Sequence, residues 1–163
     1  MENIANIHVK QETSLNPESQ KFQILVQNFC ALAQGFISKD LVPYSNTSVK
    51  AFESMPPLTQ RQIIFEFQNY LDVCIQSAAA GYNLKNGKQL LWNVLSKLQW
   101  RPCSDVFDYI ADDDIFEIYR LDNTQVFRNL KFLEICSHPI ADLYVRSWTE
   151  LYYRPESITK EIS

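Results

Sequence analysis

The sequence predicts an α+β protein, with an N-terminal helical bundle followed by a β-hairpin and short helices. Apolar residues recur every three or four positions in three long segments before residue 110, which is the spacing of amphipathic helices. Between residues 115 and 127, β-branched and aromatic residues flank an Asp-Asn pair, a pattern typical of a hairpin. Hydrophobic residues make up 46% of the chain and aromatic residues 13%, so an apolar core can form.

The expected domain boundary lies where helical spacing gives way to the hairpin pattern, after residue 110. We expect a loose polar arm over residues 1–18, a helical unit over 19–110, a hairpin-containing module over 111–155 and a polar tail over 156–163. A length of 163 residues favours one domain, or one domain with an appended half.

The first two helices are predicted on either side of a proline-rich connector. The first begins after Ser19 as N-cap and carries an apolar stripe from Phe22 to Phe36. It ends before Pro43, because the residue preceding a proline resists the helical conformation. The connector over 44–58 has room for a short helix at Val49–Ser54.

The clearest helix starts at Thr59, where Thr59 and Gln62 match a capping box, and Gly81 gives it a natural end. Its predicted inward stripe comprises Ile63, Ile64, Phe67, Tyr70, Leu71, Cys74, Ile75 and Ala78. A third helix is predicted over Gly87–Trp100, with Leu90, Leu91, Val94, Leu95 and Leu98 inward.

The hairpin is predicted from Ile115 to Phe127, with its turn at Asp122-Asn123, since Asn tolerates positive φ. Helical spacing returns at Leu130 and stops before Pro139. Short helical turns are then expected at 140–144 and 147–151.

Residues 113–155 resemble the N-terminal half of a PAS domain, and three features carry the resemblance. The first is the hairpin, since the family commonly opens with an apolar strand, an Asp-containing turn and a second strand. The second is Phe127–Asn129 leading into a helix, which is similar to the family's strand ending in Asn. The third is Pro139–Leu143 followed by Trp148–Leu151, which resembles the family's short helix and Trp-x-x-Leu turn.

The chain also departs from the family pattern. Ser137-His138 stands where many relatives have Gly-Tyr, and the later helix and three strands that complete a PAS sheet and pocket are absent. An isolated two-stranded hairpin is marginal in water. We therefore expect that the upstream helices cover it, that a second copy or another protein completes the sheet, or that the chain is part of a longer protein or an evolutionary remnant.

Charge and targeting signals narrow the functional classes. A net charge of −4 and a pI of about 5.2 predict no direct nucleic-acid partner and no binding to an anionic membrane. No stretch approaches the about 20 apolar residues of a membrane span. The polar N-terminus lacks the apolar core of a secretory signal, so we expect a cytoplasmic protein. Its four dispersed cysteines are expected to be reduced and buried.

Candidate catalytic and metal-binding residues all favour a structural interpretation. Asp112–Asp114 could collect a divalent cation, but consecutive side chains diverge, so a solvated turn is favoured. Cys136 and His138 are two positions apart, which on a helix points them away from each other, and His8 lies in the arm. His138 could be a haem ligand or a pH-sensitive group, but helix capping is favoured. We predict no catalytic residue, no metal site and no identifiable cofactor.

An aromatic and cationic cluster near the C-terminus is the candidate partner-binding site. It comprises Trp148, Tyr152, Tyr153 and Arg154. Trp, Tyr and Arg are enriched at binding hot spots, while ordinary packing against the hairpin is the alternative.

The resemblance and the missing catalytic motifs together predict a non-enzymatic bacterial signalling or regulatory protein. It would act through protein–protein contacts, with a partner or with a second copy. An accessory adaptor or effector of a transport or secretion complex is one alternative. A small-molecule sensor is another, and it requires an enclosed pocket.

Overall fold

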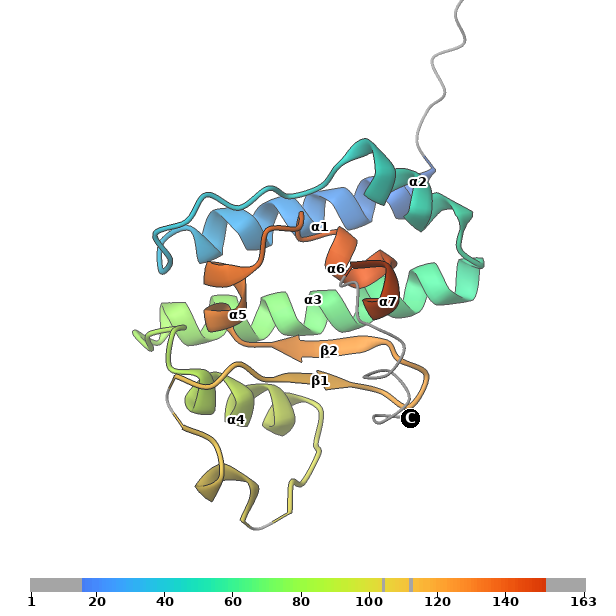
Figure 1. The fold of residues 1–163 in the computed structure, drawn as a ribbon. Coiled ribbons are helices and arrows are strands. Elements are labelled where there is room, and N and C mark those ends of the chain that lie inside the picture. The colour runs from blue at the N-terminus through green and yellow to red at the C-terminus, as the bar shows by residue number, and fades with distance from the viewer. Residues whose placement is uncertain (1–15, 104, 112, 152–163) are drawn as a thin grey trace, which may run out of the picture.

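The computed structural model describes residues 16–103, 105–111 and 113–151. Two long helices, α1 (Pro17–Ala33) and α3 (Pro57–Ala79), lie side by side, and α2 (Asn46–Ser54) packs near their N-terminal ends (Figure 1). The hairpin of β1 (Glu117–Tyr119) and β2 (Gln125–Arg128) packs on α3, as does α4 (Gly87–Lys97). The α+β fold class is therefore confirmed.

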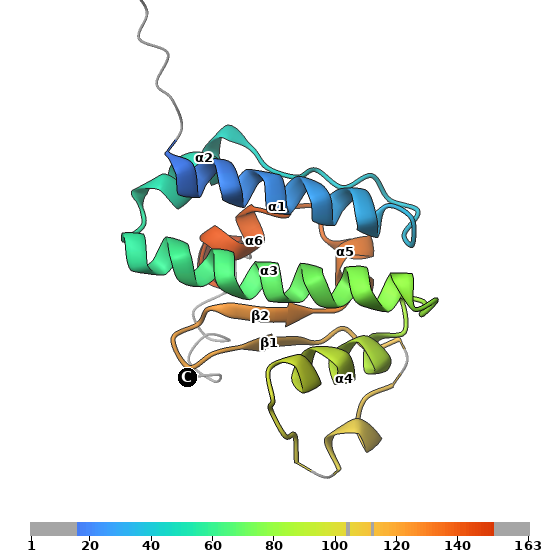
Figure 2. The same cartoon turned by 180° about the vertical axis from the view of Figure 1, so that it is seen from behind.

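Short elements complete the described chain. A 3₁₀ turn at Val106–Asp108 follows α4, and α5 (Leu130–Ile135), α6 (Asp142–Val145) and α7 (Trp148–Leu151) follow the hairpin. The helices α5, α6 and α7 lie over one face of the α1–α3 pair (Figure 1), whereas the view from behind shows α1 and α3 in front (Figure 2). The helical turns predicted near 140–144 and 147–151 are thus present. No helix in the described ranges is both long enough and apolar enough to cross a membrane.

The starts of two helices differ from the sequence prediction. The side chain of Asn16, not Ser19, caps α1 by accepting a hydrogen bond from the Ser19 N–H at 2.6 Å. Asn is a strong N-cap, and a proline at the next position is pre-set for the helix. The predicted capping box of Thr59 is also wrong, because α3 already begins at Pro57 without a side-chain cap.

Helix ends agree with the sequence prediction only in part, since α1 ends at Ala33, well short of the predicted end before Pro43. Gly81 has φ +82°, as expected of a residue that stops a helix in the left-handed region. The next helix, α4, begins at Gly87 with Asn86 as N-cap, and ends at Lys97 instead of the predicted Trp100.

One continuous apolar core joins the helices to the hairpin. The rings of Phe22 and Phe52 stack at 4.4 Å between centroids, and Tyr70 meets Phe127 of β2 edge-on at 5.6 Å. The predicted inward residues of α3 are buried except Ile75, which is 47% exposed, and Ala78, which is partly buried. Upstream helices therefore cover the hairpin, which was one of the three expected solutions.

The hairpin has the predicted position and turn. Ile118 pairs with Phe127, and Glu117 pairs with Arg128 across the strands. Asn123 has φ 64°, the left-handed conformation that Asn tolerates. All four residues of β2 are buried, whereas those of β1 are half-buried.

Candidate functional site: a pocket beside a buried arginine

The site is built around Arg128, the last residue of β2, which is only 3% exposed. Its position follows from the register, because Glu117 lies directly opposite on β1. Nη2 of Arg128 donates to Oε2 of Glu117 at 2.9 Å and to the hydroxyl of Tyr119 at 3.0 Å. The hydroxyl of Tyr119 in turn donates to Glu117.

Further contacts hold the same guanidinium. The carbon at its centre lies 4.0 Å from the ring centroid of Phe132 on α5, a cation–π contact. With its amide oriented to suit its neighbours, Gln125 accepts from Nε of Arg128 at 2.8 Å and donates to the Leu143 carbonyl at 3.2 Å. Nη1 is buried and has no hydrogen-bond partner in the described structure.

Electrostatics keep this arginine charged. Burial acts to lower the pKa of Arg128, but the carboxylate of Glu117 and the nearby Tyr119 outweigh it and raise the pKa above the usual value. Burial also raises the pKa of Tyr144, so its phenol stays protonated. The site thus combines a fixed cation with the neutral hydroxyl of Tyr144.

The helix α3 fixes the hairpin from the other side. The hydroxyl of Tyr70 donates to the backbone carbonyl of Arg128 at 2.5 Å, and burial raises the pKa of Tyr70. Nε of Arg120 lies 2.6 Å from Oε1 of Glu66, whose side chain is fully buried, and the guanidinium of Arg120 stacks over Trp100. These contacts fix where the hairpin, and so Arg128, sits.

A pocket of ≈360 Å³ opens between the hairpin and the helices α6 and α7; we name it the Arg128 pocket. Its lining comprises Tyr119, Asn123, Gln125, Arg128, Leu143, Tyr144, Arg146, Ser147 and Leu151. At one side Arg146 pairs with Asp142 and Glu150, each at 3.5 Å. The arrangement offers a buried hydrogen-bond donor next to aromatic and aliphatic walls.

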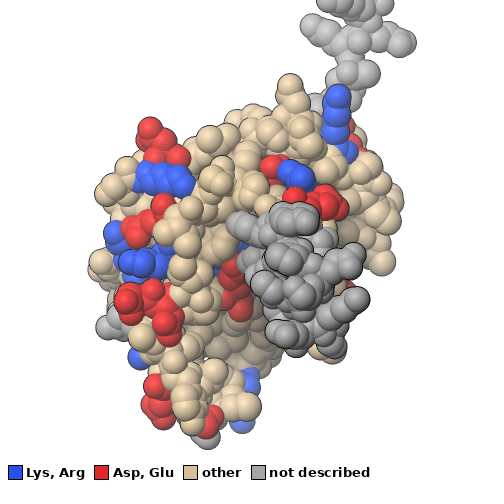
Figure 3. Space-filling view, in the orientation of Figure 1, with Lys and Arg blue, Asp and Glu red and all other residues tan. Residues whose placement is uncertain are grey.

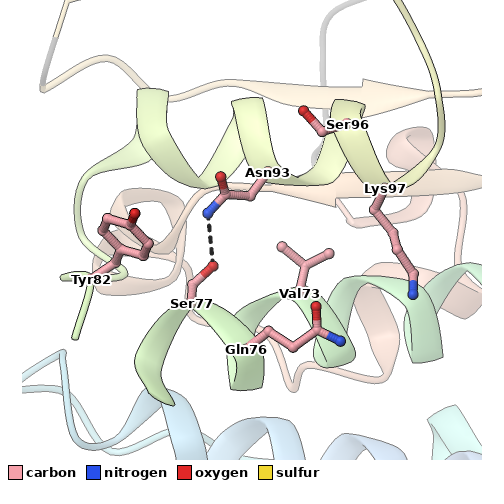
Figure 4. Close-up of a pocket in the computed structure, with 7 residues that line it drawn as sticks. All are labelled: Val73, Gln76, Ser77, Tyr82, Asn93, Ser96 and Lys97. Carbon is pink, nitrogen blue, oxygen red and sulfur yellow. Dashed lines mark hydrogen bonds between the residues drawn. The ribbon is translucent and has the colours of Figure 1, made fainter. Parts of the chain in front are cut away.

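Two other hollows are grooves on the surface. The groove between α3 and α4 holds ≈410 Å³, with Tyr82 and Lys97 near its two ends (Figure 4). Asn93 of α4 donates to Ser77 of α3 at 2.9 Å across it. The groove between α1 and α3 holds ≈490 Å³ and includes the half-exposed Ile24 and Ile75. Neither groove is lined by a buried charged side chain.

Several sequence-predicted residues can now be placed. Tyr152, Tyr153 and Arg154 lie outside the described residues, as does the side chain of Trp148, so their partner-binding role stays a prediction. A ring nitrogen of His138 lies 3.0 Å from the Leu151 carbonyl at the end of α7, a contact of the capping kind.

The acidic run and the cysteines behave largely as structural residues. Asp114 accepts from the Ala111 N–H at 2.8 Å in a turn, and no cluster of potential metal ligands occurs among the residues described. Cys30 and Cys74 are buried free thiols and Cys136 is buried, but Cys103 is exposed, so the prediction of burial is wrong for that residue. Cys103 lies after α4 has ended, outside the packed core.

Arg128 was not predicted from the sequence as a site residue. The signal was nevertheless available, because a hairpin with its turn at Asp122-Asn123 places Glu117 opposite Arg128. Opposite charges facing each other on strands rich in apolar residues indicate a buried ion pair. The hairpin pattern does not predict the other neighbours of Arg128, which are the ring of Phe132 on α5 and the residues of α6.

Comparisons of the chain with models of known families, with curated proteins and with solved structures gave no match. The fold and the site define the chain only as an α+β protein whose hairpin carries a buried arginine beside a pocket. Any functional conclusion therefore depends on this geometry.

Proposed function

We propose that this chain is a non-enzymatic regulatory protein that binds a small molecule in the Arg128 pocket. The observation that carries the proposal is a buried arginine that belongs to the lining of a pocket of ≈360 Å³ and whose Nη1 has no hydrogen-bond partner in the described structure. Buried polar atoms are almost always hydrogen-bonded in native proteins, so an unpartnered one needs an explanation. A bound ligand would supply the missing acceptor.

The size and walls of the pocket support the same proposal. Small-molecule sites are concave, mostly apolar and of about 300–1,000 Å³, with a few polar groups that orient the ligand. The Arg128 pocket lies at the lower end of that range, and Leu143, Tyr144 and Leu151 supply apolar surface. The ligand would therefore be compact.

The PAS resemblance supports a sensory role. The order of strand, turn, strand and short helices over residues 117–151 is the order that the resemblance implies. We therefore propose a bacterial signalling protein of the cytoplasm, in which ligand binding changes contacts with another protein molecule. Acidic and basic side chains are interspersed on the face drawn in Figure 3, which favours a protein partner over nucleic acid.

A pair of blocking variants tests the proposal. A library of small metabolites is screened by thermal shift against the full chain and against Ser147→Trp, which places an indole in the Arg128 pocket. The matched control Ser96→Trp places the same group in the α3–α4 groove. We expect at least one ligand to stabilise the parent and the control but not Ser147→Trp. The proposal would be contradicted if Ser96→Trp lost the ligand-induced thermal shift while Ser147→Trp kept it. It would also be contradicted if no compound shifted the melting temperature of the parent chain.

A second candidate function is self-association through the α1–α3 groove. Ile24 and Phe65 are 55% and 56% exposed, and no described element covers this side of the helices (Figure 2). The two helices run in the same direction (Figure 1), and Lys21 is the one charged residue in the described lining of the groove. A second copy related by a two-fold axis would bury the exposed apolar side chains of both molecules against each other.

Sedimentation velocity at high micromolar concentration tests this second candidate. We expect a dimer that Ile24→Asp dissociates, because a charge at the centre of the apolar face cannot be paired there. The control Leu121→Asp changes an exposed apolar residue of the hairpin turn and should leave the dimer intact. A parent chain that sediments as a monomer would rule the candidate out.

A further inference from the structure

The charged side chains that line the Arg128 pocket are both cationic. Arg128 and Arg146 belong to the lining, and no acidic residue in the described chain does. Their acidic partners Glu117, Asp142 and Glu150 lie outside the lining. Each ion pair therefore presents its positive member to the pocket.

The rest of the lining sets the shape and polarity of what fits. Tyr119 and Tyr144 contribute aromatic rings, and Leu143 and Leu151 contribute aliphatic surface. Gln125 holds the Leu143 carbonyl and the Arg128 side chain, so the wall between the hairpin and α6 is internally bonded. A ligand with a flat or compact apolar body matches these walls.

We infer that the pocket takes a small monocarboxylic acid, with its carboxylate accepting a hydrogen bond from Nη1 of Arg128. This inference rests on the proposed function and names the ligand class for the same pocket. Glu117 already offsets much of the Arg128 charge, so one negative charge suits the site better than two. A charge-assisted hydrogen bond to guanidinium is stronger than a neutral one, and it would satisfy the unpartnered donor.

Calorimetric titration of the full chain with benzoate and with its neutral isostere benzamide tests the inference. The two probes share a ring and differ in the charge at the carbonyl end. We expect benzoate to bind at least about tenfold more tightly, the effect of one buried charge-assisted hydrogen bond. Benzamide binding as tightly as benzoate would overturn the ligand class but leave the pocket function intact.

Variants separate the pocket from general charge effects. Arg128→Lys keeps a cation but removes Nη1 and should abolish the preference for benzoate. Because that variant changes a core side chain, a second variant is needed. Arg146→Gln, at the pocket's more exposed side, should weaken benzoate binding several-fold. Arg61→Gln removes an exposed cation from α3, outside this lining, and should leave binding unchanged.

Two further outcomes decide the matter. If Arg61→Gln weakens benzoate as much as Arg146→Gln does, binding follows net charge and the inference fails. If the folded parent binds neither probe at millimolar concentration while a ligand from the thermal-shift screen still requires the Arg128 pocket, the inferred class is wrong and the proposed function stands.

Discussion

The bond from Tyr70 to the Arg128 carbonyl ties α3 to β2, and Tyr70→Phe removes it with little change in shape. The two atoms are 2.5 Å apart and the bond is buried. Removing the hydroxyl leaves a buried carbonyl without this donor, which costs about 1–3 kcal/mol of unfolding free energy. The ring stays in place against Phe29 and Phe127, so no cavity term is added.

Urea denaturation followed by circular dichroism measures the effect. We expect the midpoint for Tyr70→Phe to fall while the slope of free energy against urea stays constant, which indicates a change of stability alone. Tyr109→Phe is the matched control, since Tyr109 is 79% exposed and should shift the midpoint very little. Equal stabilities for the two variants would refute the docking of the hairpin on α3 that we describe.

Three further predictions follow from the same contacts. Glu117→Ala leaves the Arg128 charge without its partner and should lower the unfolding free energy by about 3 kcal/mol in the same denaturation assay. The control Glu134→Ala removes a more exposed ion pair and should change the unfolding free energy by under about 1 kcal/mol. Cys103 is exposed while burial raises the pKa of the Cys74 thiol to about 12, so a thiol reagent at mildly alkaline pH should label the first and spare the second; mass spectrometry showing rapid labelling of Cys74 in the native protein would contradict its burial. Asn123→Gly should raise the unfolding free energy by roughly 0.5 kcal/mol or leave it unchanged, because glycine adopts the observed positive φ without strain; a marked loss of stability would exclude that turn geometry.

Periodicity in the sequence was enough to predict the main elements. The helices α1, α3 and α4 and the hairpin lie where the apolar spacing placed them, because each must bury one face and burial of a face leaves a regular local pattern. The exceptions are Ile75 of α3, which is exposed, and the end of α1, which comes at Ala33. Helix starts were less predictable where two signals competed. Asn16-Pro17 displaced Ser19 as the cap, and Pro56-Pro57 started α3 ahead of Thr59.

The Arg128 pocket could not be predicted from spacing, since its walls come from separate parts of the chain. The pair Glu117–Arg128 follows from the hairpin register, but the position of Leu143 depends on how α6 docks. That docking uses backbone bonds from Ile140 and Ala141 to the carbonyls of Val42 and Pro43, each at 2.9 Å. No side-chain pattern encodes those bonds.

Nitrogen-15 NMR of the arginine side chains tests the central structural claim. With the Arg128 guanidinium enclosed by Glu117, Gln125 and the Phe132 ring, one arginine Nε–H signal should exchange slowly with solvent and disappear in Arg128→Lys. Spectra in which all arginine Nε–H signals exchange at the rate of exposed side chains would contradict the buried guanidinium.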